Sequence, residues 1–78
     1  MRLGPEDARR IVTRAMQIMH KHIVDEFTVT VAQVREAGED FEIQGKLHMY
    51  SGGLFHYTAV IGKDLQMKSL DEKFLYNF

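Results

Sequence analysis

The stretches Phe41-Glu-Ile-Gln-Gly-Lys-Leu-His-Met-Tyr50 and Leu54-Phe-His-Tyr-Thr-Ala-Val-Ile61 decide the fold. Apolar and polar residues alternate in both, which is typical of strands with one buried face. Ser51-Gly52-Gly53 lies between them as a turn. With Gly52 at the centre of a three-residue loop, the expected pairs are Met49–Phe55, Leu47–Tyr57, Gly45–Ala59 and Ile43–Ile61. Because a shift of one residue would destroy the match of apolar faces, the pattern predicts this hairpin.

Further strand patterns flank the hairpin on both sides. A strand is expected from Phe27 to Glu36, joined to the hairpin by Ala37-Gly38-Glu39-Asp40. Downstream, Gly62-Lys63-Asp64 turns the chain into a strand from Leu65 to Ser69. The sequence therefore predicts a four-stranded antiparallel meander.

The first of these strands has two apolar phases. Near its end, Ala32 and Val34 share the phase that faces the core. Near its start the apolar residues take the opposite phase; they are Phe27, Val29 and Val31. Either a bulge near Ala32-Gln33 switches the alternation, or these three residues lie on the other sheet face. In the second case they form an exposed apolar patch together with Tyr50, Leu54 and Val60.

An amphipathic helix is expected before the sheet. Gly4 can act as its N-cap, Pro5 suits its first position, and Asp25 with Glu26 disfavours its continuation beyond about Val24. The apolar positions fall in one arc; they are Ala8, Ile11, Val12, Ala15, Ile18, Met19, His22 and Ile23. The prediction is a single α+β domain over residues 1–78, with one N-terminal helix packed on the sheet.

The last ten residues allow two structures. Ser69-Leu-Asp-Glu72 has the spacing of a capping box and could open a short helical turn. The same residues could instead prolong the last strand. The final segment is rich in large apolar side chains, so we expect it to dock on the domain or on a partner.

Composition limits the classes of function. The 78 residues have a net charge of −1, 45% hydrophobic residues and no cysteine, which excludes disulfides and thiolate chemistry. No apolar run approaches the roughly 20 residues of a membrane helix, and we expect a cytoplasmic location without membrane contact. Neither a glycine-rich phosphate loop nor a paired-carboxylate motif is present, so we lean against an enzyme and expect no cofactor.

The charges are unevenly distributed. Residues 1–24 carry five basic and two acidic side chains, whereas the remainder carries five basic and nine acidic ones. A solvent-facing stripe on the helix contains Arg10, Arg14 and Lys21, and its alternative role is to bind nucleic acid. We expect nucleic acid to be an unlikely partner, because the strands as predicted carry no exposed aromatic platform.

Histidines offer two further alternatives. In the predicted register His48 lies directly opposite His56, which could form a metal site or a pH switch, but two ligands do not make a structural metal site and we expect no metal. His22 lies within the apolar arc of the helix. A pocket near His22 would indicate a small-ligand-binding or enzymatic domain, whereas a histidine at the edge of the core needs no function.

The predicted helix is followed by four strands, which include Tyr57-Thr-Ala-Val-Ile61, a turn, and Leu65-Gln-Met-Lys-Ser-Leu70. This layout resembles that of small cystatin-like α+β domains, PepSY-type modules among them. The resemblance implies a scaffold that binds peptides, partners or copies of itself more often than it catalyses.

Our interpretation is a non-catalytic protein–protein interaction or assembly module, a homodimer or a subunit of a larger assembly. The expected contact residues are large and apolar, as is usual for interface anchors. They are Phe27, Val29, Val31, Tyr50, Leu54, Val60, Phe74, Tyr76 and Phe78.

Overall fold

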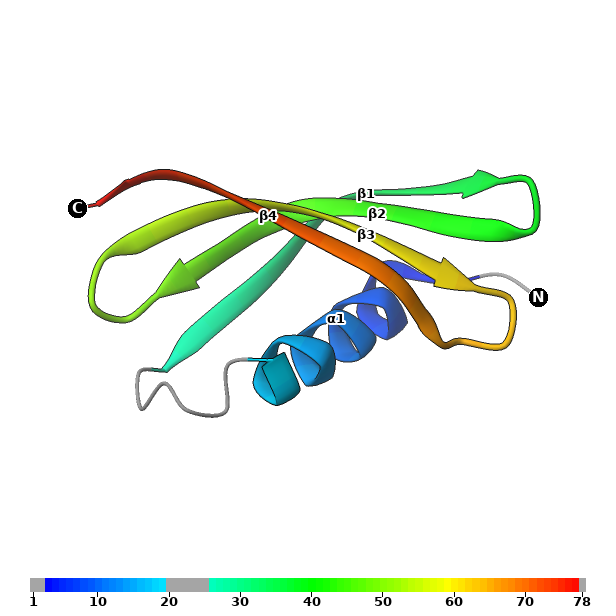
Figure 1. Cartoon of the computed structure of the whole chain (residues 1–78), viewed down its shortest axis with the longest axis horizontal. Coiled ribbons are helices and arrows are strands. Elements are labelled where there is room, and N and C mark those ends of the chain that lie inside the picture. Colours follow the sequence, from blue (N-terminus) through cyan, green and yellow to red (C-terminus); the bar gives the residue numbers. More distant parts are fainter. Residues whose placement is uncertain (1–2, 20–25, 78) are drawn as a thin grey trace.

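The computed structural model describes residues 3–19 and 26–77 of the chain. It consists of one helix and four strands: α1 (Pro5–Met19), β1 (Phe27–Ala37), β2 (Asp40–Met49), β3 (Gly53–Gly62) and β4 (Met67–Asn77). The strands form one antiparallel sheet in the order β1-β2-β3-β4, and α1 lies on one side of it (Figure 1). The predicted α+β meander is confirmed.

The helix turns a different line of residues toward the sheet than expected. It begins at Pro5, and Ala8 donates its backbone N–H to the Gly4 carbonyl at 3.0 Å. Its buried positions are Ala8, Val12 and Met16, spaced four residues apart. Ile18 and Met19, predicted to be in the apolar arc, are 64% and 50% exposed. The predicted continuation to Val24 lies outside the described residues.

A bulge in β1 switches its alternation. Val31 pairs with Gly45, the register then skips Ala32, and Gln33 pairs with Gln44. This confirms the bulge alternative. As a consequence the residues before the bulge lie on the helix side: Val29 is 2% exposed, and Phe27 and Val31 pack against the same core. Their predicted place on the far face is wrong.

The β2–β3 hairpin forms with the predicted faces but with different partners. Leu47 pairs with Phe55 and Ile43 with Ala59, a shift of two residues from the expected register. The Gly52 N–H donates to the Met49 carbonyl at 2.9 Å, and Gly52 has φ 112°. The positive-φ glycine therefore ends the three-residue loop instead of occupying its centre. Because the shift is even, every side chain keeps its face.

The last strand is longer than expected and starts later. The chain turns through Lys63–Gln66, where Leu65 has φ 64°, and the strand continues to Asn77. The alternative of a C-terminal helical turn is therefore wrong for the described residues. Register shifts skip Lys68 and Leu75, so two bulges interrupt the pairing of β4 with β3.

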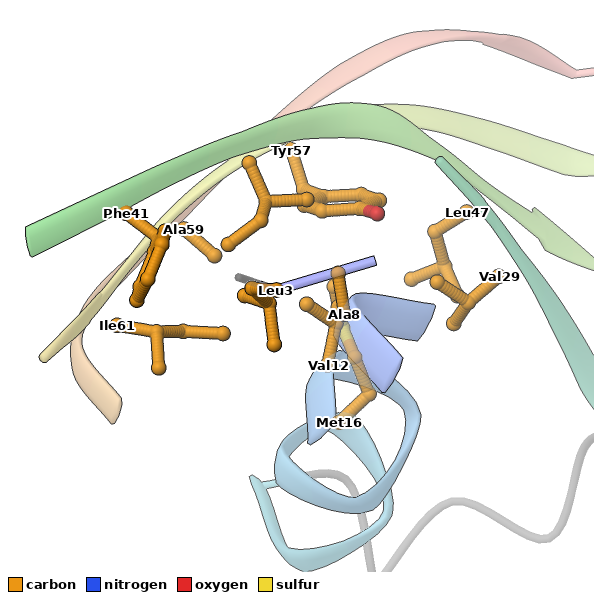
Figure 2. Packing of buried hydrophobic residues seen from close by; sticks show 11 residues of the cluster. Leu3, Ala8, Val12, Met16, Val29, Phe41, Leu47, Tyr57, Ala59 and Ile61 are labelled. Carbon is orange, nitrogen blue, oxygen red and sulfur yellow. The ribbon is translucent and has the colours of Figure 1, made fainter. Parts of the chain in front are cut away.

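The core lies between α1 and the sheet, and Figure 2 shows the core side chains of the sheet pointing toward the helix. At its centre Tyr57 is fully buried and donates its hydroxyl to the Thr30 carbonyl at 2.8 Å. Tyr57 reaches β1 by passing beneath Gly45 of β2, where a Cβ atom would lie 2.7 Å from its hydroxyl oxygen. Glycine is therefore required at position 45, because a side chain there would prevent Tyr57 of β3 from reaching the Thr30 carbonyl in β1.

Candidate interaction surfaces

The sheet face away from α1, called the outer face below, is mostly polar. Its side chains come from alternate positions of the four strands, as the register gives them. The central ones are Thr28, Thr30, Gln33, Gln44, Lys46, His48, Leu54, His56, Thr58, Asp71, Lys73 and Tyr76. The extended apolar surface expected there is absent among the described residues, because the bulge in β1 directs that strand's apolar residues into the core.

The remaining predicted contact residues are scattered. Leu54 lies on the outer face but is only 3% exposed, and Val60 is half-buried there. Tyr50 is 85% exposed in the loop between β2 and β3. Phe78 lies outside the described residues. Among the predicted contact residues that the structure describes, only Phe74 and Tyr76, near the end of β4, belong to an exposed apolar group of neighbouring residues.

That group, called the β4 patch below, consists of Phe74, Leu75 and Tyr76. These consecutive residues are 52%, 39% and 50% exposed. They lie on an edge strand, whose outer side has no partner strand among the described residues. Phe74 packs edge to face on Phe55, with ring centroids 5.3 Å apart, which fixes one end of the patch to the core. Because α1 packs mainly against β1, it leaves Phe74 partly uncovered.

A second group on the outer face is cationic. His56 pairs with Lys46 on one side and with Lys73 on the other, so the three form a row across β2, β3 and β4, called the basic row below. Both lysines are exposed and His56 is half-buried. Neither lysine has a carboxylate within ion-pair distance in the described part of the chain.

Other cations of the sheet are neutralised. Arg35 pairs with Glu42 at 3.0 Å, and Lys68 pairs with Asp40 at 2.8 Å. The hydrogen bond and the charge of Asp40 raise the pKa of Lys68. These two bridges are the pattern expected of structural charges on a sheet. The basic row departs from that pattern.

The predicted histidine pair does not form. In the observed register His48 lies opposite Leu54, so the two imidazoles are diagonal neighbours on the outer face. Within residues 3–19 and 26–77, no three metal-ligating side chains come together. His22, with the pocket expected near it, lies outside the described residues.

The helix stripe and the surface hollows are weaker candidates for a binding site than the two groups described above. Arg10 and Arg14 are exposed on α1, as expected, and Lys21 lies outside the described residues. The hollows in the described part include one of about 190 Å³, lined by Glu36, Gly38, Asp40, Phe41 and Lys63. No described helix is long and apolar enough to cross a membrane.

Sequence reasoning missed Lys46, Lys73 and Leu75. Lys46 was missed because the predicted hairpin register places it opposite Thr58 instead of His56. Lys73 and Leu75 lie beyond the predicted end of the last strand at Ser69, so the length of that strand was the signal for both. Comparison with known proteins adds no assignment: no family model matches the chain, and no curated protein or solved structure matches it either.

Proposed function

We propose that this chain is a protein–protein interaction module that self-associates through the outer edge of β4. The observation that supports the proposal is the β4 patch, where three consecutive large apolar side chains are exposed on an edge strand. Proteins usually protect such edges with charges or prolines, and a long exposed apolar run is unfavourable unless another surface covers it.

A twofold axis would bring two β4 edges together in antiparallel orientation. An axis at Asp71, Glu72 or Lys73 would set that residue opposite its own copy, with like charges facing. An axis at Phe74 sets the two Phe74 residues opposite each other and Glu72 opposite Tyr76 of the second copy, so that no like charges face. It also brings the two β4 patches side by side across the edge. We therefore place the contact near Phe74.

Measurement of the molar mass in solution tests the proposal. By analytical ultracentrifugation over micromolar concentrations, the wild-type mass should rise from 9.1 kDa toward twice that value. Leu75→Lys should remain a monomer at all these concentrations, because it places a charge on the edge at a position that β3 does not pair.

Ile18→Lys is the matched control. It replaces another exposed aliphatic residue, on α1 and away from the β4 edge, with the same charge. It should associate as the wild type does, and both variants should keep the wild-type circular dichroism spectrum. A monomeric wild type at the highest concentration, or equal dissociation by the two variants, would contradict the proposal.

A further inference from the structure

The basic row holds two lysines that no carboxylate neutralises in the described part of the chain. Lys46 and Lys73 each pair with His56, one on either side of it, so two like charges share the middle of the outer face. The two lysines are separated by two strand spacings of about 4.8 Å each, so their flexible side chains can reach one ligand from both sides of His56. A chain with a net charge of −1 therefore concentrates unpaired cations at one place on an open face.

The surroundings of the row are suited to a particular anion. The neighbouring outer-face positions carry neutral hydrogen-bonding groups, among them Thr30, Gln44 and Thr58. Tyr76 presents a half-exposed ring at the next outer-face position of β4 after Lys73. The two acidic side chains nearby are Glu42, which is bound to Arg35 and Gln44, and Asp71, opposite Thr58.

We propose that the outer face binds single-stranded nucleic acid. Lys46 and Lys73 would contact backbone phosphates, and Tyr76 would stack on a base, while the neutral side chains face base edges. Cations that follow the backbone, combined with an aromatic ring on a sheet surface, are the usual means by which proteins hold single strands. An acidic peptide would need the cations but neither the ring nor the amide groups.

This proposal does not rest on self-association. Edge pairing would join the backbones of two β4 strands, whereas the basic row and the Tyr76 ring project from the outer face of the sheet. It also differs from the sequence-based expectation, which placed nucleic acid on the helix stripe. The two surfaces can be distinguished because each contains two exposed cations that can be removed together.

The experiment is fluorescence anisotropy with a labelled twelve-nucleotide oligothymidine at low salt. The wild type should bind, and Lys46→Gln/Lys73→Gln should weaken binding at least about tenfold. That variant should also reduce the slope of log affinity against log salt by about 1.4, which corresponds to two lost phosphate contacts on a single strand. Its melting temperature should stay close to that of the wild type, because both lysines are exposed and form no ion pair with a described carboxylate.

Arg10→Gln/Arg14→Gln is the charge-matched control and should bind within about twofold of the wild type. Three results would overturn the proposal: no binding by the wild type at low salt, equal weakening by both double variants, or a polyglutamate peptide of the same charge displacing the oligonucleotide as well as an unlabelled copy does. Retained affinity in the Lys46→Gln/Lys73→Gln variant would overturn it as well.

Discussion

Replacing Gly45 with alanine should destabilise the fold strongly, although the change adds only one methyl group. The added Cβ would overlap the Thr30 carbonyl oxygen and would lie 2.7 Å from the Tyr57 hydroxyl oxygen and 2.9 Å from Cε2 of the same ring. Neither neighbour can move easily. One is backbone in β1, and the other is a fully buried side chain.

The expected loss of stability follows from the contacts that must change to accommodate the added methyl group. Relieving the overlap separates Tyr57 from Thr30 and breaks a 2.8 Å hydrogen bond, which contributes about 1 kcal/mol and more if the buried donor is left unsatisfied. Displacing β1 over the core adds about 1 to 3 kcal/mol for overpacking. The expected total of about 2 to 4 kcal/mol is a large part of the stability of a small domain.

Urea unfolding, followed by circular dichroism, measures this loss. Gly53→Ala is the control, because a Cβ there would meet mainly movable side-chain atoms, 3.3 to 3.5 Å away, and it should cost no more than about 1 kcal/mol. Tyr57→Phe alone should cost about 1 to 2 kcal/mol. The Gly45→Ala/Tyr57→Phe double variant should lose less than the sum, since both changes break the same bond.

Additive losses in that double variant, or a Gly45→Ala protein within about 1 kcal/mol of the wild type, would refute the reasoning. In the first case the glycine and the tyrosine would contribute independently. In the second, β1 would have room to move away from β2 without losing its packing on the core.

Three further predictions concern stability. Burial raises the pKa of Tyr57 from 10.0 to about 12, so between these pH values the folded state keeps a proton that the unfolded state loses. The free energy of unfolding should therefore fall by roughly 2 to 3 kcal/mol as the pH rises from below 10 toward 12. Urea titrations should show this loss in the wild type and not in Tyr57→Phe. Val29→Asp should unfold the protein by circular dichroism, because the carboxylate would enter the core; a folded variant would contradict the helix-side placement of Val29. Met16→Ala should cost about 2 to 4 kcal/mol in thermal unfolding and Ile18→Ala less than about 0.5, and equal losses would contradict the observed orientation of α1.

The faces of the β2–β3 hairpin could be predicted from the sequence, whereas the partners within it could not. Alternation has a period of two, so it identifies which side of β2 and β3 is buried and is unchanged by an even shift in register. The turn sets the register, and it depends on which glycine takes the positive φ. Both Gly52 and Gly53 were available, and the structure uses Gly52.

The helix could be located, but its rotation could not be fixed. The predicted arc combines a line through Ala8 and Val12 with a line through Ile11 and Ile18, and it leaves out Met16, which continues the first line. Which line is buried depends on where the sheet lies. Because α1 packs mainly against β1, the first line faces the core and Ile18 remains exposed.

The end of β4 determines both candidate surfaces. The sequence from Ser69 to Glu72 fits a helix cap as well as a strand, and local propensity gives no reason to choose. Pairing with β3 decides the matter, since it sets Phe74 against Phe55 and Lys73 against His56. A helical turn at this point would remove Lys73 from the basic row and would leave no apolar edge. The two proposals therefore depend on the same tertiary contact, although each is tested by different residues.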